Sequence, residues 1–174
     1  SNIIELHKLI KKKFSLAHTI KKIEVYDNSH YSGKEAVGSF ITADINGFNK
    51  KEYRKFNIKI ASKNDDYGMM KEVLNRRLNK KNNESFPDLI IIDGGLGQLS
   101  VAKEVLNNLE IKNILLISIS KGKMRNASNE KFYNSLGIQI YIKRNEPLFY
   151  YLLRLRDEAH RFAITNHRNK RNSN

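Results

Sequence analysis

Two aspartates, each at the end of a predicted strand, are the residues best suited to do chemistry. Asp93 ends the apolar run 89–92, the pattern of a strand buried on both faces, and a turn with three glycines and a helix follow it. Asp27 ends a second predicted strand, which spans residues 20–26. Carboxylates at neighbouring strand ends repel each other unless a cation lies between them, and their hard oxygen ligands suit Mg²⁺ or Mn²⁺. The pair therefore predicts a metal site, with an Asx turn at Asp27 and a solvated strand end at Asp93 as the structural alternatives.

Asp66 and His160 are further candidates, and each has a structural alternative. Asp66 falls in the first turn of a helix predicted to end at Leu78, where acids are common because they stabilise a helix N-terminus. His160 lies on the predicted helix 146–167, on the flank of its apolar stripe and in line with Arg156. Such a border position can face a cleft, but it is also where ordinary surface histidines occur.

Basic residues point to a polyanionic partner. The chain has 32 Lys and Arg against 18 Asp and Glu, a net charge of +14 that favours nucleic acid. A lysine-rich, AT-biased proteome would give the same excess, so the charge counts as support only. The candidates for phosphate contact are the loop residues Lys121, Lys123 and Arg125, together with Arg156 and His30. A solvated charge run is the alternative for the loop, and a turn cap is the alternative for His30.

The composition disfavours several other classes of protein. The chain has no cysteine, which excludes disulfides and thiolate metal sites and fits an intracellular protein. We find no signal peptide and no apolar run of membrane-spanning length. Neither the glycine fingerprint of dinucleotide binding nor the lysine of a P-loop occurs, so a nucleotide cofactor is weakly supported. We therefore expect a cytoplasmic protein that does not contact a membrane.

The order of the predicted elements is that of an α/β fold. The main strands are residues 20–26, 35–44, 52–60, 89–92 and 113–118, and helices 66–78 and 98–109 lie on either side of the fourth. Short loops make the first three strands an antiparallel meander, and a small hairpin and a long helix close the chain. This order resembles the ribonuclease H-like fold, in which a mixed five-stranded sheet (three antiparallel strands, then two parallel) is flanked by helices. It would place the Asp27 strand beside the Asp93 strand, about 4.8 Å away.

Six blocks of the sequence resemble one family, the C-terminal endonuclease domain of UvrC, the nuclease subunit of bacterial nucleotide excision repair. The matching blocks are residues 23–30 (IEVYDNSH), 53–58 (YRKFNI), 65–70 (DDYGMM), 87–98 (PDLIIIDGGLGQ), 121–125 (KGKMR) and 156–163 (RDEAHRFA). They occur in order over nearly the whole chain. The resemblance implies that Asp27, Asp93 and His160 are the catalytic residues and that Asp66 is a further functional acid. The sequence departs from the family at Leu96, where a lysine is common, and at Asn28, where an aliphatic residue is usual.

The resemblance also implies an activity and partners. We expect a nuclease that makes the incision 5′ to a lesion in double-stranded DNA, with Asp27, Asp93 and His160 holding Mg²⁺ or Mn²⁺. The incision would occur together with UvrB, which would bind through parts of the full protein that this chain lacks. His160 can be a metal ligand or a proton carrier, and the residues do not separate these roles. A catalytically silent nucleic-acid-binding module, or another structure-specific nuclease of this fold, is the alternative.

The same reading divides the chain into three segments. We expect an N-terminal linker helix over residues 1–19, a ribonuclease H-like endonuclease domain over residues 20–168, and a disordered basic tail over residues 169–174.

Overall fold

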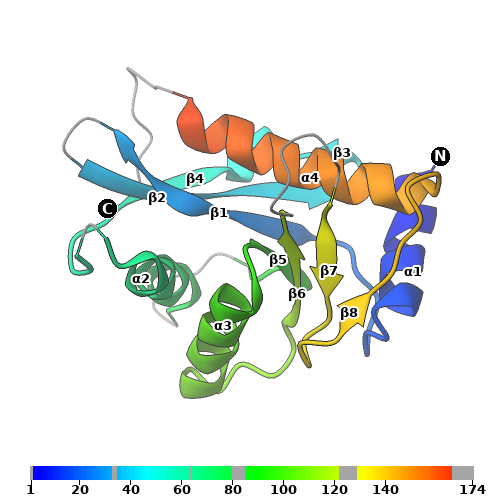
Figure 1. The fold of residues 1–174 in the computed structure, drawn as a ribbon, viewed down its shortest axis with the longest axis horizontal. Helices are drawn as coiled ribbons and strands as arrows, with labels where there is room; N and C mark the ends of the chain where they lie inside the picture. Colours follow the sequence, from blue (N-terminus) through cyan, green and yellow to red (C-terminus); the bar gives the residue numbers. More distant parts are fainter. Residues whose placement is uncertain (1, 33–34, 63, 80–84, 122–128, 166–174) are drawn as a thin grey trace.

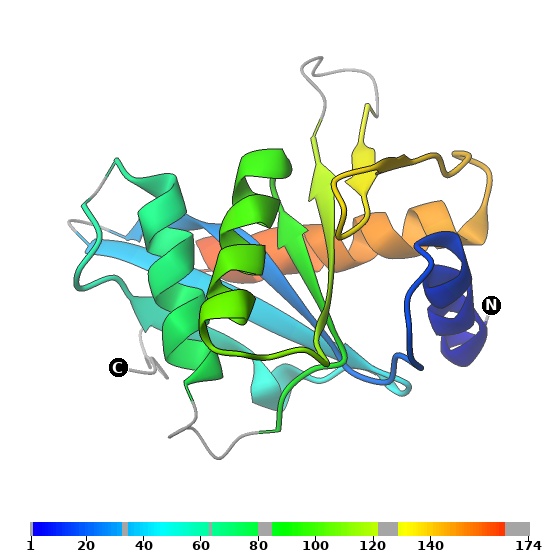
Figure 2. The ribbon, with the colours of Figure 1, turned by 90° about the horizontal axis from the view of Figure 1, so that it is seen from below.

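The computed structural model describes residues 2–32, 35–62, 64–79, 85–121 and 129–165. Within them, one mixed sheet lies between two layers of helices (Figure 1). Helix α4 (Pro147–Ile164) crosses one face of the sheet, and α1 (Ile3–Lys13) packs beside its first turns. Helices α2 (Asp66–Leu78) and α3 (Leu96–Asn108) cover the other face, as the view from below shows (Figure 2). The predicted α/β architecture is confirmed.

The sheet has the predicted arrangement of antiparallel and parallel strands. Its strands are β1 (Ile23–Ser32), β2 (Glu35–Asp44), β3 (Gly47–Phe48), β4 (Arg54–Asn57), β5 (Leu89–Asp93), β6 (Leu115–Ser120), β7 (Lys131–Tyr133) and β8 (Gln139–Ile140). β1, β2 and β4 form the antiparallel meander, and β5 and β6 run parallel to β1. The short strand β3 pairs with β2, and the predicted hairpin, β7 and β8, extends the sheet beyond β6.

Each of the central strands contributes to two separate cores, because side chains alternate between the faces of a strand. On β1, Ile23 and Val25 belong to the core beneath α4, whereas Tyr26 belongs to the core beneath α2 and α3. On β5, Leu89 and Ile91 likewise face α4. Both faces of these strands are thus buried, which explains why the sequence of β5 is a continuous apolar run up to Asp93.

The helix ends follow the local sequence. The Asp65 side chain caps α2 by accepting a hydrogen bond from the Gly68 N–H at 2.8 Å. Helix α4 begins at Pro147, whose missing N–H costs nothing in a first helical turn. Its buried residues are Leu148, Phe149, Tyr151, Leu152, Leu155 and Ala159. None of the helices among the described residues is long and apolar enough to cross a membrane.

Helix α1, predicted as part of a linker, is packed into the core beneath α4. Leu6, Ile10 and Phe14 are buried there. His7 is also buried, and its Nε2 lies 2.6 Å from the Tyr151 hydroxyl of α4. The helix ends at Lys13 rather than near residue 19, because the chain turns through a positive φ of 54° at Ser15. The predicted tail, residues 169–174, lies outside the described residues.

A buried ion pair joins β1 to α2. The Arg77 Nη2 donates a hydrogen bond to Glu24 Oε2 at 2.7 Å, and the Tyr26 hydroxyl donates to Glu24 Oε1 at the same distance. Burial raises the pKa of Glu24, while Arg77 lowers it. Arg77 also donates to the Ser85 carbonyl at 2.8 Å, so it holds the segment that leads into β5.

Replacing Arg77 with alanine should reduce the free energy of unfolding by about 3–5 kcal/mol, because it leaves the Glu24 carboxylate buried without its partner. Urea denaturation measures the loss. The matched control is Lys71→Ala, which breaks the exposed ion pair with Glu104 and should cost less than about 1 kcal/mol. Equal losses in the two variants would contradict the structural role assigned to the buried pair.

Candidate active site

The parallel pairing of β1 with β5 brings Asp27 and Asp93 together. The register ends with Tyr26 opposite Ile92, so the two aspartates are the next residues along adjacent strands. Both continue the series of side chains that faces α4. Strand β1 continues past Asp27 to Ser32, but its register with β2 shifts beyond Asp27, as at a β-bulge. The prediction that the two strand regions lie side by side is confirmed.

A hydrogen bond links the two carboxyl groups, so the pKa of each depends on the other. Burial raises the pKa of Asp27, while the hydrogen bond to Asp93 and the neighbouring His160 lower it. Burial, and then the hydrogen bond and negative charge of Asp27, raise the pKa of Asp93 to about 7, and the charge of Arg156 opposes this rise. Near neutral pH the pair therefore resists carrying two negative charges without a cation.

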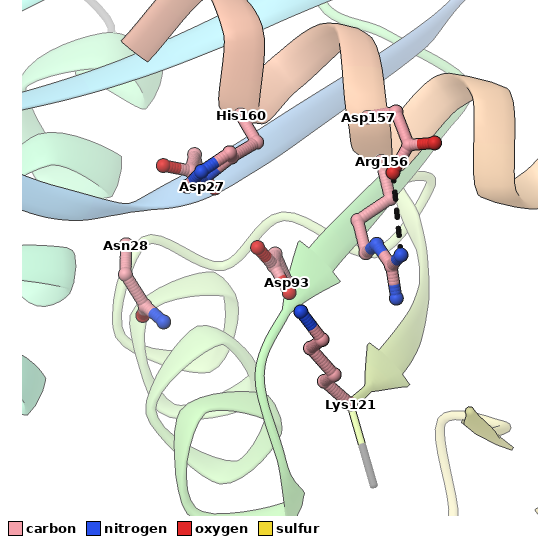
Figure 3. Close-up of a pocket in the computed structure, with 7 residues that line it drawn as sticks. All are labelled: Asp27, Asn28, Asp93, Lys121, Arg156, Asp157 and His160. Carbon is pink, nitrogen blue, oxygen red and sulfur yellow. Dashed lines mark hydrogen bonds and ion pairs between the residues drawn. The ribbon is translucent and has the colours of Figure 1, made fainter. Parts of the chain in front are cut away.

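Helix α4 places His160 over Asp27. The His160 Nδ1 lies 3.6 Å from Asp27 Oδ1, and 55% of the histidine side chain is exposed. Figure 3 shows the imidazole ring lying against Asp27, on the side of α4 that faces the strand ends. The sequence-based placement of His160 at the border of the buried stripe is confirmed, and the cleft that it borders contains the two aspartates.

A pocket of about 260 Å³ opens at this edge of the sheet (Figure 3). It is lined by Asp27, Asn28, Asp93, Lys121, Arg156, Asp157 and His160. The Lys121 ammonium group points toward Asp93 from the end of β6 (Figure 3). Acidic groups thus lie at the base of the pocket and cationic groups around it, an arrangement that can admit a phosphate group despite the acids.

Of the other predicted site residues, Asp66 is the one whose side chain is described, and it is not among the described residues that line this pocket. Asp66 is exposed in the first turn of α2. Lys123 and Arg125 lie outside the described residues. The backbone of His30 pairs with Val37 in the sheet, and its side chain lies outside what the structure describes. For these four residues the functional roles stay predictions.

A close contact joins the N-terminus of α2 to the N-terminus of α3, the helix that follows Asp93. Tyr67 of α2 packs against Gly97 of α3, and a Cβ atom at Gly97 would lie 2.0 Å from the Tyr67 hydroxyl oxygen. Glycine is needed at this position because any larger residue would displace the ring. This glycine of the Asp93 turn therefore serves the packing of α2 against α3. Gly95 is the N-cap of α3, and its N–H donates to Gln98 Oε1 at 3.1 Å.

Sequence reasoning missed Asp157 and Asn28 as residues that line the pocket. Asp157 precedes His160 by three positions on a helix, a spacing that places two side chains on one face, so the pattern contained this signal. Asn28 follows Asp27 where the register of β1 with β2 shifts, and no sequence pattern predicts that shift. Glu130, which pairs with Arg156, was also missed because the two residues are 26 positions apart and no local pattern connects them.

The donor set suits a small divalent cation. Asp27 and Asp93 offer adjacent carboxylate oxygens, and Mg²⁺ is commonly held by one or two carboxylates and water. Ser39 lies opposite Asp27 in the β1–β2 pairing, and its buried hydroxyl has no hydrogen-bond partner among the described residues. In that part of the chain, no three His, Asp or Glu side chains are grouped closely enough to hold a metal together. His160 as a third ligand therefore stays a prediction.

The raised pKa of Asp93 predicts that metal-free protein loses stability as the pH rises. A carboxyl group whose pKa is higher in the folded state stabilises the fold fully below its unfolded pKa of about 4. This stabilisation is lost progressively as the pH rises from about 4 to the folded pKa of about 7. Asp93→Asn removes this loss. The variant should therefore gain stability relative to the unsubstituted protein as the pH rises. The difference between their free energies of unfolding should be roughly 2–4 kcal/mol larger at pH 7.5 than at pH 4. Urea denaturation with a chelator across this range tests it, and parallel curves would contradict it.

Comparison with known proteins agrees with this geometry. Residues 11–164 match the family described as the UvrC RNAse H endonuclease domain. The UvrABC system protein C of Hyphomonas neptunium is 47% identical over 173 residues, which cover 93% of this chain and 28% of the relative. That of Jannaschia sp. is 46% identical over 167 residues, covering 91% of this chain and 26% of the relative. The chain thus spans about a quarter of the length of these relatives.

Two solved structures are similar at a lower level. The endonuclease V of Bacillus subtilis has a TM-score of 0.41 and 17% identity, over 61% of this chain and 47% of that one. The catalytic domain of human endonuclease V has a TM-score of 0.40 and 13% identity, over 88% and 66%. The sequence match is far stronger, and it spans the strands that carry both aspartates and the helix that carries His160. The chain therefore belongs to the UvrC RNase H endonuclease domain family.

Proposed function

We propose that this protein is a Mg²⁺- or Mn²⁺-dependent endodeoxyribonuclease that hydrolyses a phosphodiester bond in DNA. The observation that carries the proposal is the pair of facing carboxyl groups, Asp27 and Asp93, in a pocket that also contains Lys121, Arg156 and His160. A site built only to bind DNA gains nothing from two adjacent acids, because they repel phosphate. This argues against the silent binding module.

Each residue of the pocket has a separate task. Asp27 and Asp93 would hold the cation through adjacent oxygens, with His160 as the third ligand because its half-exposed ring has room to turn toward it. When bound, the cation polarises the scissile phosphate and lowers the pKa of the attacking water. Lys121 and Arg156 would contact phosphate oxygens, which positions the backbone without reading its sequence. Hydrolysis would leave a 3′-hydroxyl and a 5′-phosphate.

The biological substrate is the finer part of the proposal. The family and the name of the relatives, UvrABC system protein C, favour DNA repair by excision of damage. We propose that the incision lies 5′ to a lesion in double-stranded DNA presented by UvrB, and that the protein works in the cytoplasm. Lys123, Arg125 and His30 would extend the phosphate contacts, and Asp66 would act from the neighbouring N-terminus of α2.

Asp27→Asn and Asp93→Asn should each reduce incision at least about a hundredfold while DNA binding survives or tightens, because each removes a cation ligand and one negative charge. The test is nicking of a lesion-bearing duplex with UvrB in Mg²⁺ or Mn²⁺, by protein that includes the regions of its longer relatives that this chain does not span. Glu104→Gln, on the exposed surface of α3, is the control. Incision at the normal rate by either aspartate variant, or none by the unsubstituted protein, would refute the proposed site or activity.

His160→Ala should lower the apparent affinity for the metal, and added Mn²⁺ should restore part of the rate, because Mn²⁺ tolerates imperfect nitrogen and oxygen sites better than Mg²⁺. Metal titration of the incision rate measures both effects. A slower rate with unchanged metal affinity, a new pH dependence near the imidazole pKa and no rescue would instead make His160 a proton carrier. Near-normal incision would remove it from the site.

A further inference from the structure

Arg156 is held between two carboxylates at the wall of the pocket. Its Nη1 donates to Glu130 Oε2 at 3.2 Å, and its Nη2 donates to Asp157 Oδ1 at 3.2 Å. Only 13% of the arginine side chain is exposed. Figure 3 shows the guanidinium group extending from α4 toward the strand ends, with Asp157 beside it. Each terminal nitrogen therefore already donates one hydrogen bond to a carboxylate before any phosphate arrives.

The two partners differ in burial, and therefore in how readily they can be exchanged. The Glu130 side chain is 6% exposed, and its Oε1 has no hydrogen-bond partner among the described residues. Within that part of the chain, Arg156 is what stabilises this buried carboxylate, so breaking the pair is costly. The Asp157 side chain is 69% exposed, where an ion pair is worth little. The contact of Arg156 with Asp157 therefore costs less to break than its contact with Glu130.

The sheet holds Glu130 in place. It immediately precedes β7, whose first residue, Lys131, pairs with Ser120 of β6. Ser120 in turn precedes Lys121, the other described cation of the pocket. The Glu130 carboxylate is therefore fixed relative to the strand end that carries Lys121, and through it the Arg156 guanidinium is fixed relative to the same edge. A guanidinium held by one nitrogen keeps its other nitrogens aligned for a second anion.

We propose that Glu130 is a positioning residue, which holds Arg156 oriented toward the scissile-strand phosphate, and that Asp157 occupies Arg156 Nη2 until a phosphate oxygen displaces it. The inference rests on the proposed function, since it assigns the ligand of Arg156 as a phosphate of the bound DNA. The exchange replaces one anionic oxygen acceptor by another on the same nitrogen, so Arg156 stays paired throughout. Glu130 keeps the guanidinium in place while Asp157 turns out to solvent.

The proposal predicts opposite effects for the two carboxylates. Glu130→Gln should lower kcat for incision by roughly ten- to a hundredfold with a smaller change in KM, the range expected when a contacting group is misaligned. Asp157→Asn should lower the Kd for duplex DNA by about three- to tenfold, because phosphate no longer competes with a carboxylate for Nη2. Glu158→Gln is the matched control: it breaks a Glu–Arg161 pair on the same helix, outside the pocket residues, and should change neither quantity.

Two comparisons separate a positioning role from a structural one. The double variant Glu130→Gln with Arg156→Ala should be no slower than Arg156→Ala alone, because Glu130 acts only through the arginine. The unfolding midpoint of Glu130→Gln should show that this variant is folded under the assay conditions, so that unfolding explains none of its loss in kcat. Additive losses in the double variant, or normal kcat in Glu130→Gln while Asp93→Asn is inactive, would overturn the positioning role and leave the proposed nuclease standing.

A binding readout tests the exchange without catalysis. In metal-free protein, ¹⁵N NMR of the Arg156 guanidinium should show two distinct Nη signals, because the Glu130 contact slows rotation of the group. Added duplex should shift one of them, and the separation should collapse in Glu130→Gln. The inference would be overturned if added duplex shifted neither signal, or if the unsubstituted protein gave a single Nη signal. Either result would count whether or not the protein incises DNA.

Discussion

The constraint on which the structure depends is the cost of placing two carboxyl groups side by side in a largely buried position. Asp27 and Asp93 meet because two parallel strands pair in one register, and burial, followed by the hydrogen bond and negative charge of Asp27, raises the pKa of Asp93. The apolar residues of the same strands support this arrangement. They bury both faces of the sheet, and a shift of either strand by one residue would turn its aspartate to the opposite face.

The helices divide the remaining work between the two faces. On one face α2 and α3 pack over the second core, and the buried pair of Glu24 and Arg77 ties β1 to α2. On the other face α4 contributes to the core through one stripe and to the pocket through the adjacent one, which carries Arg156, Asp157 and His160. One helix thus couples the packing of the sheet to the geometry of the site, which makes the position of α4 the second requirement for function.

The two Arg–Glu pairs illustrate how similar interactions serve different ends. Arg77 and Glu24 are fully enclosed, and the arginine is committed to acceptors within the fold. Arg156 and Glu130 are also largely buried, but the Nη2 of Arg156 donates to Asp157, an exposed acid that lines the pocket. A paired guanidinium stabilises a fold when all its partners are buried, and it can receive a ligand when one partner is exposed.

Local patterns in the sequence determined the main elements and the meander followed by parallel strands, because period 2 and period 3.6 are visible along the chain. The same patterns placed Asp27 and Asp93 at neighbouring strands, whereas His160 joined them only through the resemblance of its sequence block to a known family. The packing of α1, the shift in β1 beyond Asp27, and the pairing of Glu130 with Arg156 were decided only by the tertiary structure. Each of these features depends on which segments distant in sequence come into contact. Burial, which also arises from those contacts, decides whether a charged pair is fixed or exchangeable. No local pattern contains that information.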